Sequence, residues 1–308
     1  MKRRTALLLA ASMVLGVLGA TPVVADETTG VDGGTYLALG DSVAAGTQQP
    51  EPFTDRGYAD RLFRKLQRQH GFDDFVNLSC PGDDSTEMIS GIGGASEFGS
   101  LCYGPFAQLP PGGTSQLDAA VEYLTTHPGE VRLITLTMGA NDILACDPNS
   151  PDAEACLATQ LGVIAANLPV IITALRAAAP GVPIVAMNYY NPNLAFWIVD
   201  PALADAALAL SPAFTGTLEA VYGALGVPVV DIEKRFRTFV TDGNPPKNVR
   251  VICRFTLMCE RASGVYILSD YDPNTPGPQT DIHPSNKGYR TIAKKFMRTI
   301  NDLGLLYS

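Results

Sequence analysis

The chain has 308 residues, of which 46% are hydrophobic and 17% are charged. This composition fits a folded chain with a substantial core and excludes a disordered or fibrous one. A formal net charge of −9 at pH 7 argues against nucleic acid or anionic lipid as a partner.

The first 25 residues have the features of a secretory signal peptide. Lys2, Arg3 and Arg4 precede an apolar stretch that is shorter than the ~20 residues of a membrane-spanning helix, and small residues follow it up to Ala25. We expect cleavage after Ala25 and a secreted (extracellular) mature chain of residues 26–308. Its net charge would be −12, because three positive residues leave and no acidic residue does.

Further along the chain, aspartate, asparagine, proline or glycine interrupts every apolar stretch, including the alanine-rich residues 202–210. We therefore expect the mature protein to have no stable membrane anchor. We also expect it to be a monomer.

The mature sequence alternates between short apolar runs, typical of buried strands, and longer segments with helical periodicity. In chain order, the expected strands are residues 35–39, 74–78, 131–137, 182–187 and 227–232. The expected helices are residues 58–66, 117–124, 157–178, 202–225 and 292–303, with a break or kink near Pro169 and a break at Pro212. Residues 91–113 and 241–277 hold glycine, proline and cysteine and are expected to be stapled surface loops.

Strands that alternate with helices predict an α/β fold of one domain, a three-layer sandwich in which helices flank a central, mainly parallel sheet. Functional loops of such sheets lie beyond the carboxyl ends of the strands. Four segments should therefore gather at one edge of the sheet. They are residues 40–42, residues 80–82, residues 139–142 and the segment around His283.

Ser42 is the candidate nucleophile. A serine hydroxyl attacks a carbonyl only if a base removes its proton and donors stabilise the developing oxyanion. Ser42 follows an expected strand at a glycine-containing turn, which can expose its hydroxyl. Taken alone, a serine at this place is more often the N-cap of a helix.

His283 is the candidate base among three histidines. His70 follows polar residues at the end of an expected helix, and His127 precedes a Pro-Gly turn at the opposite edge of the sheet. His283 precedes the last expected helix, on the side of the other loops. Without a partner serine, it would be an ordinary helix-entry residue.

Together these segments resemble the SGNH hydrolases, also called GDSL esterases and lipases. The resemblance extends from residue 36 to residue 289, and the blocks follow in the family's order and at roughly its spacing. The matching residues are Gly40-Asp41-Ser42, Gly82, Gly139-Ala140-Asn141-Asp142 and His283-Pro284. It implies the fold of that family and an esterase or lipase that cleaves a small-molecule or lipid ester, with a place in lipid metabolism and no cofactor.

The resemblance implies a role for each matching residue. Ser42 would be the nucleophile and His283 the general base. The oxyanion hole would consist of the backbone N–H groups of Ser42 and Gly82 and the side-chain amide of Asn141. These residue types suit the roles, because glycine lets the backbone approach a substrate and a neutral amide donates without a competing proton transfer.

The third member of the triad departs from the family pattern. The family usually places an aspartate three residues before the histidine, where this chain has Thr280, whereas Asp281 is two residues before it. Asp281 could orient His283, or a backbone carbonyl of Thr280 or Asp281 could accept the imidazole N–H, as in some members of the family. Asp281 could also be only a surface charge near a helix N-terminus.

Other carboxylates at the strand ends suit structural roles. Asp41 and Asp142 each follow a glycine-containing turn, where a carboxylate can accept backbone N–H bonds. Asp83 and Asp84 alone are weak support for a cation site, because further oxygen ligands are missing nearby in the sequence. We expect no required metal.

An even number of cysteines in an exported chain predicts disulfides, and six are present. A metal site is disfavoured because the sequence has no CxxC pair and no histidine close to a cysteine. Locality along the chain and the resemblance to secreted actinobacterial members together imply the pairs Cys80–Cys102, Cys146–Cys156 and Cys253–Cys259.

The sequence bears on three alternative functions: an α/β-hydrolase, a binding module without activity and a carbohydrate acetyl esterase. An α/β-hydrolase is disfavoured because Ser42 lacks the second glycine of a Gly-x-Ser-x-Gly elbow. A catalytically silent envelope- or carbohydrate-binding module would fit if one block were lost, yet all four are present. The local disulfides favour a lipase-like enzyme over a carbohydrate acetyl esterase, which stays open. Aromatic residues near the loops, Tyr189 and Tyr190 among them, are candidates for an acyl site or for ordinary packing.

Overall fold

The computed structural model describes residues 33–91, 102, 115–146, 150–270 and 280–306. The expected signal peptide lies outside the described residues, as does most of the expected loop of residues 91–113.

Five parallel strands form the central sheet in the order β2-β1-β3-β4-β5. Every residue of β1 and of β4 is buried, as expected where helices cover both faces of a sheet. The predicted parallel sheet is confirmed. The strands are β1 (Thr35–Gly40), β2 (Asp74–Asn77), β3 (Val131–Thr137), β4 (Ile184–Met187) and β5 (Val229–Val230).

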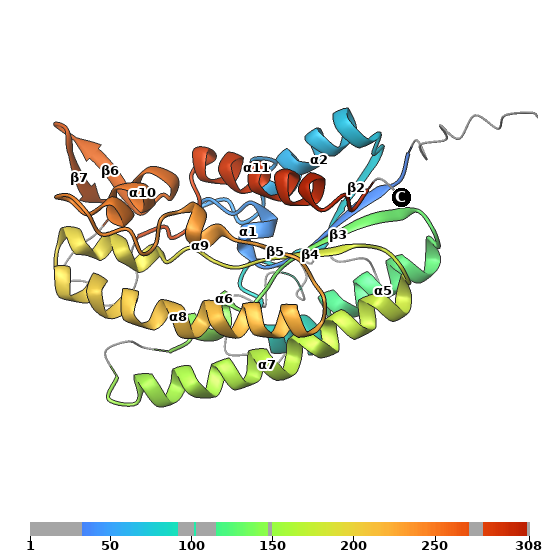
Figure 1. The fold of residues 1–308 in the computed structure, drawn as a ribbon, viewed down its shortest axis with the longest axis horizontal. Coiled ribbons are helices and arrows are strands. Elements are labelled where there is room, and N and C mark those ends of the chain that lie inside the picture. The colour runs from blue at the N-terminus through green and yellow to red at the C-terminus, as the bar shows by residue number, and fades with distance from the viewer. Residues whose placement is uncertain (1–32, 92–101, 103–114, 147–149, 271–279, 307–308) are drawn as a thin grey trace, which may run out of the picture. The chain divides into compact units, whose positions relative to one another are not determined.

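Helices cover both faces of this sheet (Figure 1). On one face lie α2 (Tyr58–His70) and α11 (Asn286–Asp302), which pack against each other. On the other lie α5 (Gln116–Thr126), α7 (Ala153–Ala178) and α8 (Pro201–Ala224). The predicted three-layer α/β sandwich is therefore confirmed. Shorter helices follow the strands, namely α1 (Ser42–Ala45), α3 (Ser85–Ser90), α6 (Ala140–Leu144) and α9 (Ile232–Arg235).

The predicted break at Pro212 is wrong, and of the break or kink predicted near Pro169 the break is wrong. α7 continues through Pro169 and α8 continues through Pro212. A proline inside a helix costs about 3 kcal/mol, because it removes one hydrogen bond and crowds the preceding turn. Buried side chains on both sides of each proline offset this cost, for example Leu168 and Ile171 in α7.

Gly162, Asn167 and Pro169 interrupt the apolar sequence of α7, as expected, but they do not shorten the helix. By length and composition, this 26-residue helix could cross a membrane. Its buried side chains, however, lie on a face that packs against α3, α5, α6 and α8. Length and composition alone are therefore weak support for a membrane span, and α7 is accounted for as a covering helix of the sheet.

The expected irregular loop of residues 241–277 is in part regular. It contains α10 (Lys247–Phe255) and an antiparallel hairpin of β6 (Cys259–Ala262) and β7 (Val265–Leu268). Short elements such as these gain little from local propensity. Their order comes from burial of Ile252, Phe255 and Met258, which the local sequence pattern does not reveal, and from the expected Cys253–Cys259 disulfide.

Candidate active site

The sheet order brings three of the predicted site residues to one edge of the sheet. The chain runs from β1 to β2 on one side and then to β3 on the other, so the loops after β1 and β3 diverge at the carboxyl edge. Ligand sites of open parallel sheets lie at such a point. Ser42 follows β1, Gly82 follows β2 and Asn141 follows β3, and we call these residues, with Asp281 and His283, the strand-end site.

The turn before Ser42 requires glycine. Gly40 has φ of 132°, and a Cβ at this position would lie 2.1 Å from the carbonyl oxygen of Thr137 in β3. Asp41 is the N-cap of α1, and Ser42 is the first residue of this helix. The N-cap role that Ser42 could have had therefore belongs to its neighbour.

Asp41 is buried and accepts hydrogen bonds that hold the turn before Ser42, which is the structural role expected of it. Its Oδ1 accepts from Val43 N at 2.9 Å and from Thr137 Oγ1 at 3.0 Å, and its Oδ2 accepts from the Tyr189 hydroxyl. Burial raises the pKa of the Asp41 carboxyl, and these hydrogen bonds oppose the rise. The charge of a protonated His283 opposes it too.

Two backbone N–H groups of the strand-end site are available as donors. Within the described part of the chain, no hydrogen bond uses the N–H of Ser42 or of Gly82. Gly82 has φ of 94°, a conformation that favours glycine. The turn that contains it is tied to β1, because Cys80 N donates to Gly40 O at 2.8 Å.

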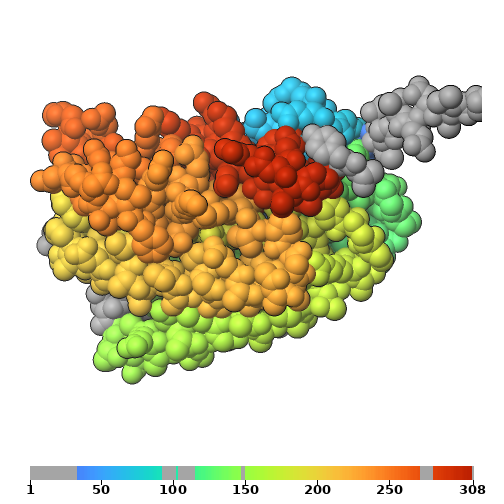
Figure 2. Space-filling view, in the orientation of Figure 1, coloured from blue at the N-terminus to red at the C-terminus, as the bar shows by residue number. Residues whose placement is uncertain are grey.

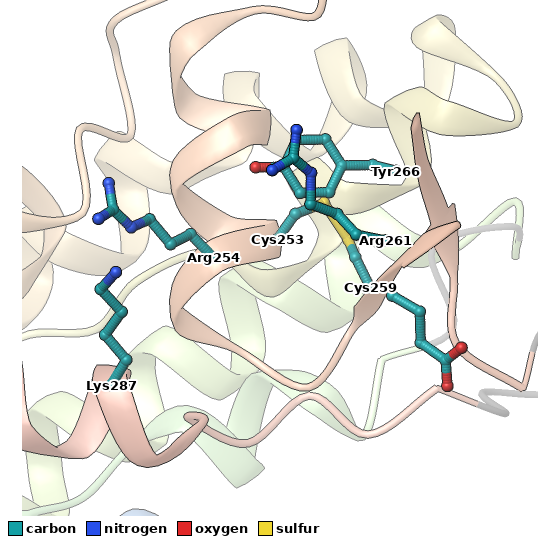
Figure 3. A pocket seen from close by; sticks show the side chains of 7 residues that line it. Cys253, Arg254, Cys259, Arg261, Tyr266 and Lys287 are labelled. Carbon is teal, nitrogen blue, oxygen red and sulfur yellow. A yellow bond between two sulfur atoms is a disulfide. The ribbon is translucent and has the colours of Figure 1, made fainter. Parts of the chain in front are cut away.

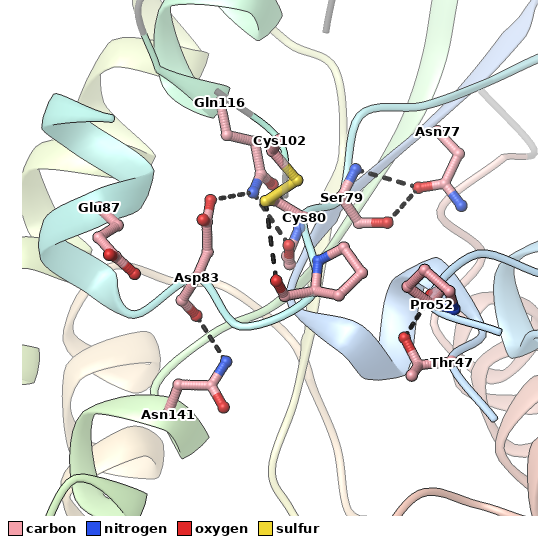
Figure 4. Close-up of a disulfide and its surroundings, with 12 residues drawn as sticks. Thr47, Pro52, Asn77, Ser79, Cys80, Asp83, Glu87, Cys102, Gln116 and Asn141 are labelled. Carbon is pink, nitrogen blue, oxygen red and sulfur yellow. Dashed lines mark hydrogen bonds between the residues drawn. A yellow bond between two sulfur atoms is a disulfide. The ribbon is translucent and has the colours of Figure 1, made fainter. Parts of the chain in front are cut away.

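Asn141 lies next to this turn (Figure 4). Its Nδ2 donates to the carbonyl oxygen of Asp83 at 2.8 Å, which fixes the amide and leaves its second N–H hydrogen for another acceptor. Gln116 from α5 joins the same loops. Its side-chain amide donates to Gly40 O at 2.9 Å and to Asp83 Oδ2 at 2.9 Å, while its Oε1 accepts from Gly40 N at 2.6 Å.

Asp142, beside Asn141, fastens α6 to α3. Its carboxylate accepts from the backbone N–H of Ser85 at 3.0 Å and from the Ser85 hydroxyl at 2.5 Å. Burial raises the pKa of Asp142 to about 6, although the bonds from Ser85 lower it. Glu87 of α3 forms a capping box with Asp84, and burial raises the pKa of Glu87 to about 7.

Asp281 is the residue that contacts the imidazole of His283. Asp281 Oδ1 lies 2.6 Å from His283 Nδ1 and also accepts from His283 N at 2.9 Å. Burial raises the pKa of the Asp281 carboxyl. The hydrogen bonds and the charge of His283 lower this pKa by more than burial raises it, so it lies below its ordinary value. With the Nδ1 proton shared with this carboxylate, Nε2 is the nitrogen free to accept a proton.

The segment after α1 ties the serine turn to the histidine loop. Gln49 N donates to Asp281 Oδ2 at 2.9 Å, and the buried Gln48 donates from Nε2 to Pro284 O at 3.0 Å. Tyr190, which follows β4, donates from its hydroxyl to Ile282 O at 2.9 Å. The two halves of the site are thus joined by bonds that span more than 230 residues of sequence.

Three disulfides lie near these loops, in the pairs that the resemblance implied. The Cα–Cα distances are 5.9 Å for Cys80–Cys102, 5.8 Å for Cys146–Cys156 and 4.8 Å for Cys253–Cys259. The Cys80–Cys102 disulfide anchors the chain just before Gly82 (Figure 4). In the described ranges, no group of three or more histidine, cysteine or acidic residues could hold a metal ion.

Sequence reasoning missed several residues that support the site. Tyr189 and Tyr190 were candidates for an acyl site, but both are buried and use their hydroxyls on Asp41 and Ile282. Gln116 and Gln48 had no recognisable signal, because an amide that pairs with distant backbone resembles any other polar residue in a sequence. Their burial, visible only after folding, distinguishes them.

The chain is similar to known ester hydrolases. The model of the GDSL-like lipase/acylhydrolase family matches residues 38–291. No curated protein sequence matches the chain.

Solved structures share the fold. Phospholipase A1 from Streptomyces albidoflavus NA297 has a TM-score of 0.52 at 14% identity, covering 87% of this chain and 98% of its own. The lipase Lip_vut3 from a goat rumen metagenome has a TM-score of 0.50 at 17% identity, covering 86% and 96%. The extracellular lipase of Streptomyces rimosus has a TM-score of 0.50 at 15% identity, covering 87% and 99%.

Proposed function

The chain belongs to the GDSL-like lipase/acylhydrolase family, and from this premise we propose that it hydrolyses carboxylic esters through an acyl-enzyme on Ser42. The observation that carries the proposal is a histidine bonded to a carboxylate, in a loop that Gln48 and Gln49 tie to the segment after Ser42. Acyl transfer by serine requires such a set.

In the proposed reaction, His283 Nε2 takes the proton of the Ser42 hydroxyl as the oxygen attacks the ester carbonyl. Asp281 holds the imidazole in the tautomer that leaves Nε2 unprotonated and stabilises the imidazolium that forms. The 2.6 Å bond to Asp281 supports this residue, rather than a backbone carbonyl, as the group that orients His283.

The oxyanion that forms would accept hydrogen bonds from Ser42 N, Gly82 N and the free N–H of Asn141. These donors are held before a substrate arrives, because Asp41, Gln116 and the Asp83 carbonyl fix the turns that carry them. The alcohol then leaves with the proton from His283, and a water molecule, activated by the same base, releases the acid.

Two measurements test this proposal. An organophosphonate should label folded protein at Ser42, detected by mass spectrometry, and the Ser42→Ala variant should remain unlabelled. Rates on p-nitrophenyl esters of increasing chain length, beside release of acetate from acetylated xylan, then define the substrate. Turnover of the p-nitrophenyl esters supports a lipase-type enzyme, whereas activity on the xylan alone would indicate a carbohydrate acetyl esterase. No labelling of folded protein would favour a silent binding module.

We also propose that the protein is secreted. Three disulfides in a chain of this size support folding in an oxidising compartment. N-terminal sequencing of the protein recovered from culture medium should begin at Asp26. Recovery of full-length protein from the cell alone would contradict secretion.

A further inference from the structure

A pocket outside the strand-end site carries unusual charge for this acidic chain. It lies where the end of α10, the β6–β7 hairpin and the first turn of α11 meet (Figure 3). In Figure 2 the hairpin, in dark orange, stands out at the edge of the surface. We call this the basic pocket and define it by Arg254, Glu260, Arg261, Tyr266 and Lys287. Three cations thus share a pocket with one carboxylate.

Among the residues that the structure describes, none of these cations forms an ion pair with a carboxylate. The ion pairs among the described residues join Arg56 to Glu51, His283 to Asp281 and Arg298 to Asp302, and none involves the basic pocket. Positive charges held in one pocket repel each other, and an anion between them replaces this repulsion with attraction.

The side chains are arranged to donate into the pocket. Figure 3 shows Arg254 and Lys287 reaching out side by side from α10 and α11. The guanidinium carbon of Arg261 lies 5.4 Å from the centre of the Tyr266 ring. Arg261 Nη2 donates to the carbonyl oxygen of Gly264 at 3.4 Å, and the other N–H groups of this guanidinium remain for a ligand.

The frame of the pocket does not depend on its cations. The Cys253–Cys259 disulfide joins the end of α10 to the start of β6. Backbone bonds of 2.9 Å run from Ser285 N to Phe255 O and from Leu257 N to the carbonyl oxygen of His283. Substitution of the three cations should therefore change the charge of the pocket and leave its shape intact.

We propose that the basic pocket binds a phosphate-type oxyanion, carried by a lipid headgroup or free in solution. The Arg254 guanidinium can pair with two oxygens of a tetrahedral anion and Lys287 adds a point charge beside it, while Arg261 adds positive charge elsewhere in the same pocket. The net negative charge of the chain does not prevent this, because exposed charges beyond about 10 Å are largely screened.

The other face of the hairpin distinguishes the two sources. Val265 is 64% exposed and Ile267 is 42% exposed, and both alternate with the pocket residue Tyr266 along β7. At a lipid surface these two side chains would contact acyl chains while the pocket held a headgroup phosphate. Free phosphate would need the cations alone.

The test uses the folded full-length protein with two probes. Inorganic phosphate is titrated by calorimetry at about 0.1 M salt, where the screening holds, and vesicles of phosphatidylglycerol or of phosphatidylcholine are sedimented with the protein at the same salt. A pocket variant carries Arg254→Gln, Arg261→Gln and Lys287→Gln. Its matched control carries the same charge change at exposed cations that do not line the pocket, on α2, α7 and the middle of α11, as Arg68→Gln, Arg176→Gln and Lys294→Gln.

We expect the unmodified protein to bind at least one probe. The pocket variant should bind it about tenfold or more weakly, because charge-assisted hydrogen bonds are lost, whereas the control should change little. Binding of vesicles without binding of phosphate identifies a headgroup, and binding of both shows that phosphate suffices. Failure of both probes, or an equal loss in the control variant, overturns the proposal.

Ester hydrolysis gives an independent readout. All three proteins should hydrolyse a soluble p-nitrophenyl ester at similar rates, because the substituted cations do not touch the strand-end site. The anion proposal can therefore fail while the proposed enzyme activity stands, and the reverse also holds.

Discussion

The strand-end site and the basic pocket differ in whether their charged side chains have partners within the protein. In the strand-end site, Asp41 and Asp281 have protein partners, and the groups left free are single N–H donors. In the basic pocket, among the described residues, three cations lack a carboxylate partner. The difference suits different tasks. Catalysis needs dipoles fixed before the substrate arrives, whereas a binding pocket keeps charge for its ligand.

Ser42→Ala should cause the largest loss of activity. A small loss would contradict the assignment of catalysis to the strand-end site. Loss of a serine nucleophile lowers kcat by about 10⁶-fold. The rate on a soluble p-nitrophenyl ester measures this, with circular dichroism as a check of folding. Arg261→Gln in the basic pocket is the control and should retain full activity. Turnover by the Ser42→Ala protein would remove this residue from the reaction.

Asp281→Asn should lower kcat on the order of 10⁴-fold, still far less than Ser42→Ala. An amide in place of the carboxylate donates toward His283 Nδ1 and favours the wrong tautomer. The same ester assay measures it. A loss of tenfold or less would mean that a backbone carbonyl orients the imidazole instead.

Asn141→Ala tests the free donors of the strand-end site. Removal of one oxyanion donor costs about 10²–10³-fold in kcat, with little change in KM, because the bond forms in the transition state. Steady-state kinetics separate these two parameters. An increase in KM at constant kcat would assign Asn141 to ground-state binding.

Gln48→Ala tests whether the ties between the two loops matter. The substitution removes the bond from Gln48 to Pro284 O and loosens the His283 loop relative to Ser42. We expect kcat to fall about tenfold. Gln67→Ala, at an exposed glutamine of α2, is the matched control and should behave like the unmodified protein. Equal activity of both variants would show that the remaining bonds suffice.

Glu87→Gln gives the smallest effect, on stability rather than activity. The pKa of Glu87 is raised from 4.5 to about 7 in the folded state, so ionisation weakens the fold as pH rises through this window. Glutamine keeps the capping box without ionising. Urea unfolding should show a gain on the order of 1 kcal/mol at about pH 8 and none at about pH 4. An equal difference at both pH values would contradict this.

The local sequence pattern was sufficient to predict the elements with strong periodicity and the candidate residues that lie at strand ends. Residues 131–137 form the predicted strand, because the run is apolar and the sheet buries it on both faces. The positions of Ser42, Gly82 and Asn141 after successive strands follow from the same pattern, since carboxyl ends of parallel strands share an edge.

Tertiary structure alone decided the features that depend on partners far away in the chain. α7 runs through Pro169 because packing outweighs the local cost of the proline. Asp281 rather than a carbonyl contacts His283 Nδ1, because Gln49 holds the carboxylate from the other side. Ser42 and His283 could thus be proposed from the sequence. The contacts that orient them could not, because each pairs residues brought together only by folding.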